Sequence, residues 1–121
     1  MALTLLWKKA YLPQILSGTK TATRRKTRPM VKVGHAYRIR SGFFDSLEER
    51  IRVDRLYTQR LGEMTEGDAV MEGAESLAAF RDEWETLSGA WRPEEVVWVV
   101  EFHLENRHQS PALVDEPPNN Q

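Results

Sequence analysis

Residues 15–25, "ILSGTKTATRR", say most about the fold of this chain. A short apolar segment with Pro13 at its first position and Gly18 just past its end predicts one or two helical turns over 12–18. In residues 20–26 threonines alternate with other side chains, which predicts a strand. The stretch is also basic, so it is either a solvated strand or an anion-binding site.

Positive charge is concentrated in the first part of the chain. Residues 1–44 contain ten Lys and Arg and no Asp or Glu, whereas residues 45–121 contain seven basic and eighteen acidic residues. The two parts carry +10 and −11, which together give the net charge of −1. Such asymmetry favours a polyanion or another anionic ligand for the basic part. The alternative is that the two parts neutralise each other within the fold.

The composition is typical of one globular domain. The chain has 121 residues, of which 40% are hydrophobic and 29% charged, and this suits a single unit. The absence of cysteine excludes disulfides and thiolate metal sites, and it fits a reducing compartment. The apolar start "MALTLLW" is too short for a signal peptide, and no run is long enough to cross a bilayer. We therefore expect a cytoplasmic protein with no membrane partner.

Hydrophobic periodicity and turn residues predict an α+β fold. Strands are expected at 3–7, 20–26, 36–40, 50–58 and 96–104, with a loop over 41–49. Beyond the helix at 12–18, helices are expected at 66–72 and 77–87, because Thr65 and Ser76 are suitable N-caps.

The end of the chain differs in composition from the rest. Residues 109–121, "QSPALVDEPPNNQ", contain three prolines and few apolar side chains. Such a segment buries too little apolar surface to offset the entropy of ordering. The sequence therefore predicts one domain over 1–108 and a disordered tail over 109–121.

Four segments resemble the ASCH domain family: "ILSGTKTATRR", "VGHAYRIR", "LGEMTEGDAVMEGAESLAAFRDEW" and "VVWVVEF". The resemblance extends over residues 5–104, and the glycine-x-Lys-Thr segment is its most specific part. It implies a small PUA-like β-barrel of about five to six strands with flanking helices. It also implies a cleft lined by the segment "GTKTATRR".

The same resemblance implies a function. ASCH proteins act on or with RNA, and a branch of small bacterial members hydrolyses N4-acetylcytidine with a lysine, a threonine and a glutamate. Those residues fall on Lys20, Thr23 and Glu72 of this sequence. We expect a domain that binds RNA or a modified nucleoside in a basic cleft. The alternative is an amidohydrolase that removes an acyl group from nucleosides similar to N4-acetylcytidine.

The chemistry of amide hydrolysis leaves the three roles open. A threonine hydroxyl attacks if a base takes its proton, and a lysine serves as that base or polarises the carbonyl. Glu72 either orients the lysine or carries the proton to the leaving amine. Residues three apart point to opposite faces of a regular strand. Lys20 and Thr23 therefore converge only if Lys20 belongs to the turn after Gly18 or if the strand bends. The alternative partner of Thr23 is Thr21, which lies on the same strand face.

The remaining polar residues of this region are candidates for contacts to nucleic acid. Guanidinium and ammonium groups bind phosphate oxygens, so the predicted set is Thr21, Arg24, Arg25, Lys26, Arg28 and Lys32. Alternation sends Arg24 and Arg25 to opposite strand faces, so one of them is expected in the cleft. An exposed basic loop that binds nothing is the alternative for the residues after 25.

Aromatic side chains near these charges are candidates for stacking on a base. By position they are Trp7, Tyr11, Tyr37, Phe43 and Phe44, whereas the apolar patterns around Trp84 and Trp98 predict core positions.

Neither a metal nor another cofactor is predicted. The three histidines, His35, His103 and His108, lack the spacing of a metal motif. "GTKT" lacks the leading glycine spacing of a phosphate-binding loop.

Overall fold

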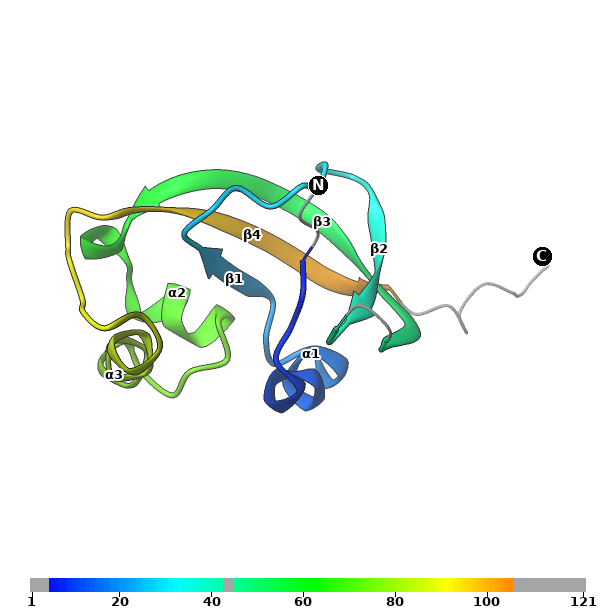
Figure 1. Ribbon diagram of the computed structural model, residues 1–121, viewed down its shortest axis with the longest axis horizontal. Helices are drawn as coiled ribbons and strands as arrows, with labels where there is room; N and C mark the ends of the chain where they lie inside the picture. The colour runs from blue at the N-terminus through cyan, green and yellow to red at the C-terminus, as the bar shows by residue number, and fades with distance from the viewer. Residues whose placement is uncertain (1–4, 43–44, 106–121) are drawn as a thin grey trace.

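The computed structural model describes residues 5–42 and 45–105 of the chain. In this part the structure is α+β, with three α-helices and four strands (Figure 1). The helices are α1 (Leu12–Ser17), α2 (Glu66–Met71) and α3 (Leu77–Ser88), and two short 3-10 helices, η1 (Lys9–Tyr11) and η2 (Leu61–Glu63), precede α1 and α2. The strands are β1 (Ala22–Arg25), β2 (Ala36–Arg40), β3 (Ser46–Arg60) and β4 (Val96–Glu105).

The strands form one antiparallel sheet in the order β1-β4-β3-β2. The long strands β3 and β4 pair from Arg50 opposite Glu105 to Arg60 opposite Val96, with a register shift between Val53 and Arg55. In Figure 1 these two strands form a curved ribbon along the whole molecule, and β1 lies beside its middle. The ribbon therefore has two ends that other elements cover separately.

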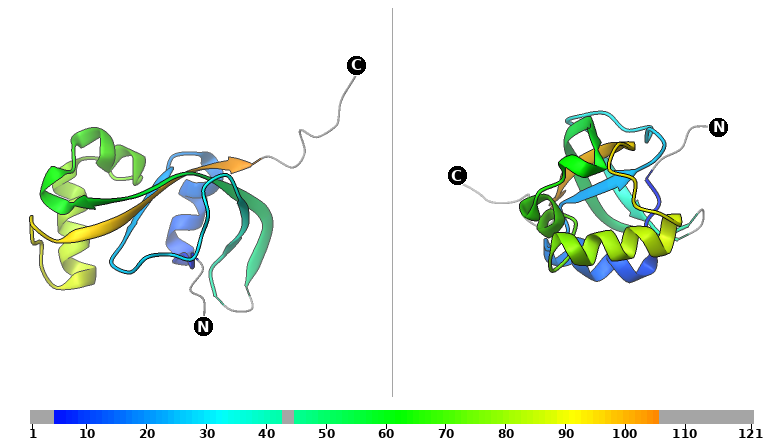
Figure 2. Two further views of the ribbon diagram at one scale, coloured as in Figure 1. Left: turned by 90° about the horizontal axis from the view of Figure 1, so that it is seen from above. Right: turned by 90° about the vertical axis from the view of Figure 1, so that its left-hand side faces the viewer.

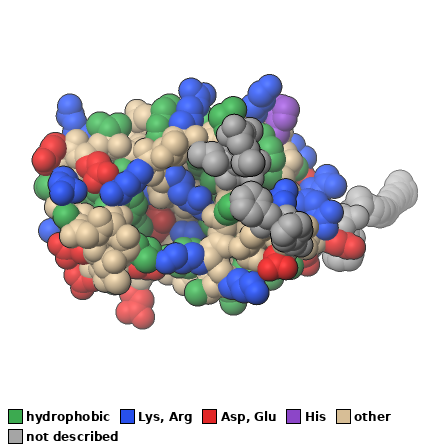
Figure 3. Space-filling view, in the orientation of Figure 1, with side chains coloured by type: hydrophobic (Ala, Val, Ile, Leu, Met, Phe, Trp, Pro, Cys, Tyr) green, Lys and Arg blue, Asp and Glu red, His purple; other side chains and the backbone are tan. Residues whose placement is uncertain are grey.

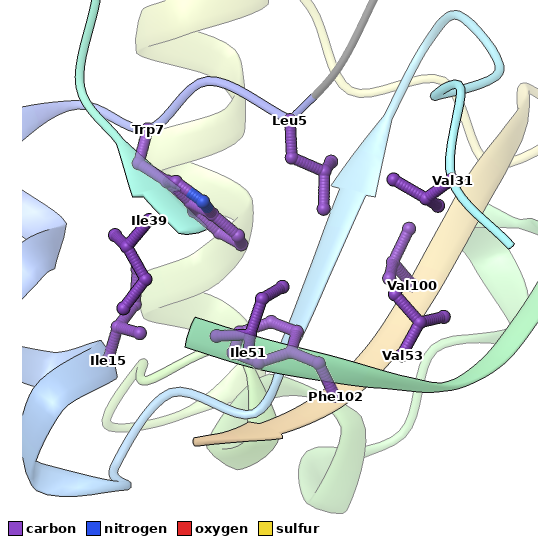
Figure 4. Packing of buried hydrophobic residues seen from close by; sticks show 9 residues of the cluster. All are labelled: Leu5, Trp7, Ile15, Val31, Ile39, Ile51, Val53, Val100 and Phe102. Carbon is purple, nitrogen blue, oxygen red and sulfur yellow. The ribbon is translucent and has the colours of Figure 1, made fainter. Parts of the chain in front are cut away.

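Each end of the ribbon has its own hydrophobic core. The first core joins the N-terminal segment and α1 to β2, β3 and β4, and Figure 4 shows its buried members: Leu5, Trp7, Ile15, Val31, Ile39, Ile51, Val53, Val100 and Phe102. The second core packs α2 and α3 on the other end, through Leu61, Met64, Ala69, Phe80, Trp84 and Val97. Both α1 and α3 lie on the same side of the sheet, α3 at one end of the ribbon and α1 nearer its middle (Figures 1 and 2). A pocket lies between these two helices, beside β1.

The helix ends follow from the residues at them. Thr65 is the N-cap of α2 and shares a capping box with Asp68, in which each side chain bonds the other's backbone N–H. The Ser76 hydroxyl caps α3 by accepting from the N–H of Ala79. Gly18 ends α1 with φ of +82°, a left-handed conformation that suits glycine.

Most expected elements are confirmed, and three differ. The described part has four strands, fewer than the five to six expected, because residues 5–7 form no strand and contribute one backbone bond, from Trp7 N–H to the carbonyl of Arg40. The strand expected at 50–58 is longer, because residues from Ser46 onward pair with β2 and Leu47 packs against the first core. The strand expected at 20–26 is limited to 22–25.

Some expectations lie on residues that the structure does not describe. Phe43, Phe44 and the 109–121 tail are outside the described residues. Among the residues it does describe, no helix has both the length and the apolar character that crossing a membrane requires.

Candidate functional site

A pocket of about 460 Å³ lies between the two cores and receives residues from η1, α1, β1, the end of α2, and α3. Figure 3 shows it as a hollow near the middle of one face, with an acidic side chain at its base and lysine and arginine side chains around it. Its volume lies in the range of sites for small organic ligands, about 300–1,000 Å³.

A buried carboxylate joins two cations in this pocket. Glu72, at the C-cap of α2, accepts from Lys20 Nζ at 3.0 Å through Oε1 and from Arg24 Nη1 at 2.9 Å through Oε2. Lys20 Nζ also donates to the backbone carbonyl of Glu72 at 2.9 Å. Lys20, Arg24 and Glu72 are 4%, 6% and 8% exposed. One lysine thus neutralises the carboxylate and satisfies a carbonyl at the negative end of the α2 dipole.

The backbone around Gly18 places Lys20 in the pocket. The N–H of Lys20 donates to the carbonyl of Gln14 in α1, and the N–H of Thr21 donates to the carbonyl of Met71 in α2. Lys20 therefore precedes β1, which begins at Ala22. The alternation of a strand does not apply to it, so Lys20 and Thr23 line the same pocket.

A left-handed backbone and a close contact to Gln14 of α1 favour glycine at position 73. Gly73 has φ of +90°, and a Cβ there would lie 2.7 Å from Gln14 Oε1. The Gln14 side-chain amide donates to the Gly73 carbonyl at 3.2 Å. This contact holds the two walls of the pocket together next to Glu72.

Arg24 is held on all three of its side-chain nitrogens. Nε and Nη2 donate to Gln59 Oε1 at 3.1 and 2.8 Å, while Nη1 bonds Glu72. Asp68 lies 3.7 Å from Arg24 Nη2. Burial of Asp68 alone would raise its pKa, but bonds from the Thr65 N–H and Gln59, with the charge of Arg24, lower the pKa below its usual value. Arg24 is therefore part of a structural ion network at the base of the pocket.

Arg25 has a different environment from Arg24. Its Nε donates to Thr23 Oγ1 at 3.1 Å, and its guanidinium lies over the Trp7 ring, 5.0 Å from the centroid. Burial lowers the pKa of Arg25, while Glu72 and Tyr11 act in the opposite direction. Arg25 therefore places a poorly hydrated positive charge beside the Thr23 hydroxyl.

Tyr11 connects the two walls of the pocket. Its ring lies 5.0 Å from Lys20 Nζ, and its hydroxyl donates to Glu83 Oε2 of α3 at 2.5 Å. Burial and this bond raise the pKa of Tyr11 above its ordinary value, so the phenol stays protonated and remains a donor. Tyr11 thus contacts Lys20 through its ring and Glu83 through its hydroxyl.

The structure brings together most of the residues predicted for the site. The pocket is lined by Lys20, Thr23 and Glu72 and also by Arg24, Arg25 and Lys26. The expectation that one arginine of the pair would line the cleft is wrong, because the pocket lies at β1, the edge strand of the sheet, and receives both faces of it.

Three predicted residues do not line the pocket: Thr21, Arg28 and Lys32. The Arg28 guanidinium lies over the Trp98 ring, 4.9 Å from its centroid. The backbone N–H of Lys32 donates to the Tyr37 hydroxyl. Their contacts to nucleic acid stay a prediction.

The sequence did not indicate several residues that shape the site. Gln59 and Asp68 hold Arg24, and Glu83 holds Tyr11. Trp84 belongs to the second core as predicted, yet it also lines the pocket. A strand glutamine, a capping aspartate and a helix glutamate are common on surfaces, so no signal in the sequence distinguished these side chains.

The described residues contain no group of three or more His, Asp or Glu side chains that could hold a metal ion.

Solved structures share this fold at low sequence identity. The ASCH domain of Lactobacillus crispatus JV V101 matches with a TM-score of 0.55 and 21% identity, over 76% of this chain and 68% of that one. Protein EF3133 from Enterococcus faecalis V583, of family DUF984, matches with a TM-score of 0.54 and 18% identity, over 83% of this chain and 75% of that one. No protein-family model and no curated protein matches the sequence. The likeness is one of architecture, and the chain has the fold of an ASCH domain.

Proposed function

We propose that the pocket binds an acylated nucleoside similar to N4-acetylcytidine and hydrolyses its amide bond. The observation that carries this proposal is the buried pair of Lys20 and Glu72, 3.0 Å apart in the same pocket as the Thr23 hydroxyl. A nucleophile, a proton carrier and cationic donors in one pocket are the groups that acyl transfer requires.

The proposed reaction has two steps. Lys20 passes one proton to Glu72 and then takes the proton of Thr23, whose oxygen attacks the acyl carbon. Glu72 gives its proton to the amine as the carbon–nitrogen bond breaks, which leaves an ester on Thr23. Water then hydrolyses this ester, releases a carboxylic acid and restores the threonine hydroxyl.

The rest of the pocket suits a nucleoside. Phe80, Trp84 and Leu87 supply an apolar wall from the second core and α3. The ring of Tyr11 lines the pocket beside Lys20. A flat base requires such aromatic and apolar walls, whereas its exocyclic amide requires polar groups at one end.

The test is incubation of the protein with N4-acetylcytidine, followed by chromatographic measurement of cytidine. Thr23→Ala and Glu72→Gln should each remove nearly all turnover. Thr19→Ala is the matched control, because Thr19 lies in the same segment but is exposed and bonds the Ser17 hydroxyl. Turnover by Thr23→Ala at the wild-type rate would exclude Thr23 as the nucleophile.

A second candidate function is capture of RNA at the same pocket. It rests on Lys26 and Arg28, which are exposed and follow the pocket segment directly. Lys26 lines the pocket and Arg28 does not. The backbone of an RNA strand with one base in the pocket would therefore run from Lys26 to Arg28. The test is how strongly the binding of single-stranded RNA depends on salt concentration.

A further inference from the structure

Glu83 is the second carboxylate in the pocket lining, and its environment differs from that of Glu72. Glu72 pairs with Lys20 and Arg24. Among the residues that the structure describes, the carboxylate of Glu83 forms no ion pair and accepts one hydrogen bond, from the Tyr11 hydroxyl to Oε2. Because Glu83 is exposed on α3, its Oε1 is free to accept hydrogen bonds from a ligand.

The charge of Glu83 selects the kind of group that it binds. An ionised carboxylate only accepts hydrogen bonds, so its partner must be a donor such as a hydroxyl. A phosphate beside Glu83 would place two negative charges together, which disfavours binding. The pocket wall at Glu83 therefore suits the neutral, hydroxyl-rich part of a ligand.

We propose that Glu83 is a ribose-binding residue, whose carboxylate accepts hydrogen bonds from the 2′- and 3′-hydroxyls of the nucleoside. Tyr11 is a positioning residue that holds this carboxylate through its own hydroxyl. The substrate class is then the ribonucleoside, in preference to the 2′-deoxynucleoside and the free base. This inference rests on the proposed function, because it takes the ligand to be a nucleoside with its amide at Lys20 and Thr23.

Tyr11 connects the ribose site to the reacting end of the pocket. Its ring lies 5.0 Å from Lys20 Nζ, and its hydroxyl bonds Glu83. A single six-membered ring thus joins Lys20 to Glu83. A pyrimidine base is also a six-membered ring, and it carries its N4 amide and its ribose at opposite positions. A base with its amide at Lys20 can therefore direct its ribose toward Glu83.

The carboxylate is held in place before a ligand arrives. Trp84, the next residue of α3, is buried in the second core, and Tyr11 packs against the first core. The bond between Tyr11 and Glu83 therefore joins elements that are anchored separately. An acceptor that is already fixed loses less entropy when it binds a ligand. Dinucleotide-binding folds use an acidic side chain for a ribose hydroxyl in the same way.

The first experiment measures nucleoside binding without turnover. Cytidine, 2′-deoxycytidine and cytosine are titrated into the protein, and binding is followed by NMR. In the wild type, cytidine should bind about tenfold more tightly than 2′-deoxycytidine, the effect of one hydrogen bond to a charged group, and cytosine should bind most weakly. This ratio should fall toward one in Glu83→Ala.

Glu85→Ala is the matched control, because Glu85 is exposed on the same helix but outside the pocket lining. It should keep the wild-type ratio. A purely structural defect would weaken both nucleosides equally and leave the ratio unchanged, so the ratio separates recognition from folding. Tyr11→Phe keeps the ring beside Lys20 and removes the hydroxyl, and it should lower the ratio in part.

Three outcomes would overturn the ribose site. They are equal affinity for cytidine and 2′-deoxycytidine in the wild type, an unchanged ratio in Glu83→Ala, and no saturable binding of either nucleoside. A wild-type ratio in Tyr11→Phe would overturn the positioning role of Tyr11.

The second experiment compares turnover of N4-acetylcytidine with that of N4-acetyl-2′-deoxycytidine. The wild type should favour the ribonucleoside about tenfold in kcat/KM, and Glu83→Ala should lose this preference mainly through a higher KM for N4-acetylcytidine. The two proposals fail separately. Preference for cytidine that depends on Glu83, in a protein without turnover, would support the ribose site and exclude the hydrolysis. Equal turnover of both substrates would overturn the ribose site and leave the hydrolysis standing.

Discussion

At the scale of single residues, Glu72 forms ion pairs with two buried cations at once. Its carboxylate binds Lys20 and Arg24, and the three side chains are less than a tenth exposed. Removing one partner of a buried ion pair leaves an uncompensated charge and costs about 3–5 kcal/mol. We therefore expect Glu72→Gln to lower the free energy of unfolding by about that amount, measured by urea denaturation.

A control and a second variant make this prediction specific. Glu85→Gln removes the same charge from the exposed face of α3 and should change stability by less than about 0.5 kcal/mol. Adding Lys20→Met to Glu72→Gln should recover part of the loss, since it removes one of the stranded cations. If the double variant is less stable than Glu72→Gln by the full effect of a single substitution, the two residues are not coupled.

At this scale the sequence predicted which residues form the site better than it predicted the surroundings of their side chains. The resemblance of "GTKTATRR" to a known segment indicated Lys20 and Thr23. Their burial, and the bond from Lys20 to a residue 52 positions away, depend on how α1 and α2 pack together. No local pattern records such a contact. The sequence predicted a basic cleft, and the fold buries Lys20 there in an ion pair with Glu72.

At the scale of elements, the capping box of α2 also supports the site. Asp68 accepts from the Thr65 N–H and from Gln59, and it lies beside Arg24. Its pKa is lowered in the folded protein, so its contribution to stability is complete above the unfolded value of about 3.9. This contribution is lost as the pH falls through the lower folded pKa.

The corresponding variant is Asp68→Asn. At pH 6 it should be less stable than the wild type by about 1 kcal/mol, the usual value of an N-terminal capping interaction. The difference should shrink toward zero as the pH is lowered below about 4, measured by thermal melting across pH. Glu63→Gln is the control, because Glu63 lies near α2 in an exposed pair with Arg60. A difference that stays constant down to pH 2 would show that the charge of Asp68 contributes nothing.

The contact between α1 and α2 gives a second prediction for elements. Gly73→Ala adds a Cβ both at φ of +90° and 2.7 Å from the Gln14 amide oxygen, whereas Gly34→Ala meets φ of +87° with nothing within 4 Å. The strain common to both costs about 1–2 kcal/mol. We expect Gly73→Ala to lose more stability than Gly34→Ala and to lower turnover, since Glu72 moves with its neighbour. Equal losses in chemical denaturation would mean that Gln14 moves aside freely.

Helices whose ends are marked by a local capping residue could be predicted from the sequence. Strand ends that depend on pairing with another strand were harder to predict. Thr65 and Ser76 marked the starts of α2 and α3 correctly, because a cap is a local interaction. The start of β3 at Ser46 was missed, since "SLEE" is polar and directly follows Asp45. Its strand conformation comes from pairing with β2.

At the scale of the whole molecule, ion pairs within the fold balance part of the charge asymmetry of the chain. Five ion pairs join the basic part before residue 44 to carboxylates after it: Lys9–Asp45, Lys20–Glu72, Arg24–Asp68, Arg24–Glu72 and Lys26–Glu95. The alternative that the two parts neutralise each other is therefore correct for these residues.

The α+β class followed from the order of elements, but the separate cores, which create the pocket between them, could not be derived from hydrophobic spacing.

Some cations of the basic part form none of these ion pairs, and they are candidates for contacts to RNA phosphates. Arg28 and Lys32 are exposed on the segment after the pocket and line no part of it. If they contact phosphates, single-stranded RNA should bind with a strong salt dependence, with a slope of about −0.7 in log K against log salt for each phosphate. Arg28→Ala with Lys32→Ala should reduce the slope by about 1.4, measured by fluorescence anisotropy at several salt concentrations.

The control is a second double variant, Arg81→Ala with Arg92→Ala, which removes the same charge from outside the pocket lining. A general effect of net charge would weaken RNA binding equally in both double variants, whereas local phosphate contacts would change it only in the first. Hydrolysis of free N4-acetylcytidine should be the same in both, because a nucleoside without phosphates ends at the pocket. A flat salt response in the wild type would exclude phosphate contacts. The exposed basic segment would then have no role in binding RNA.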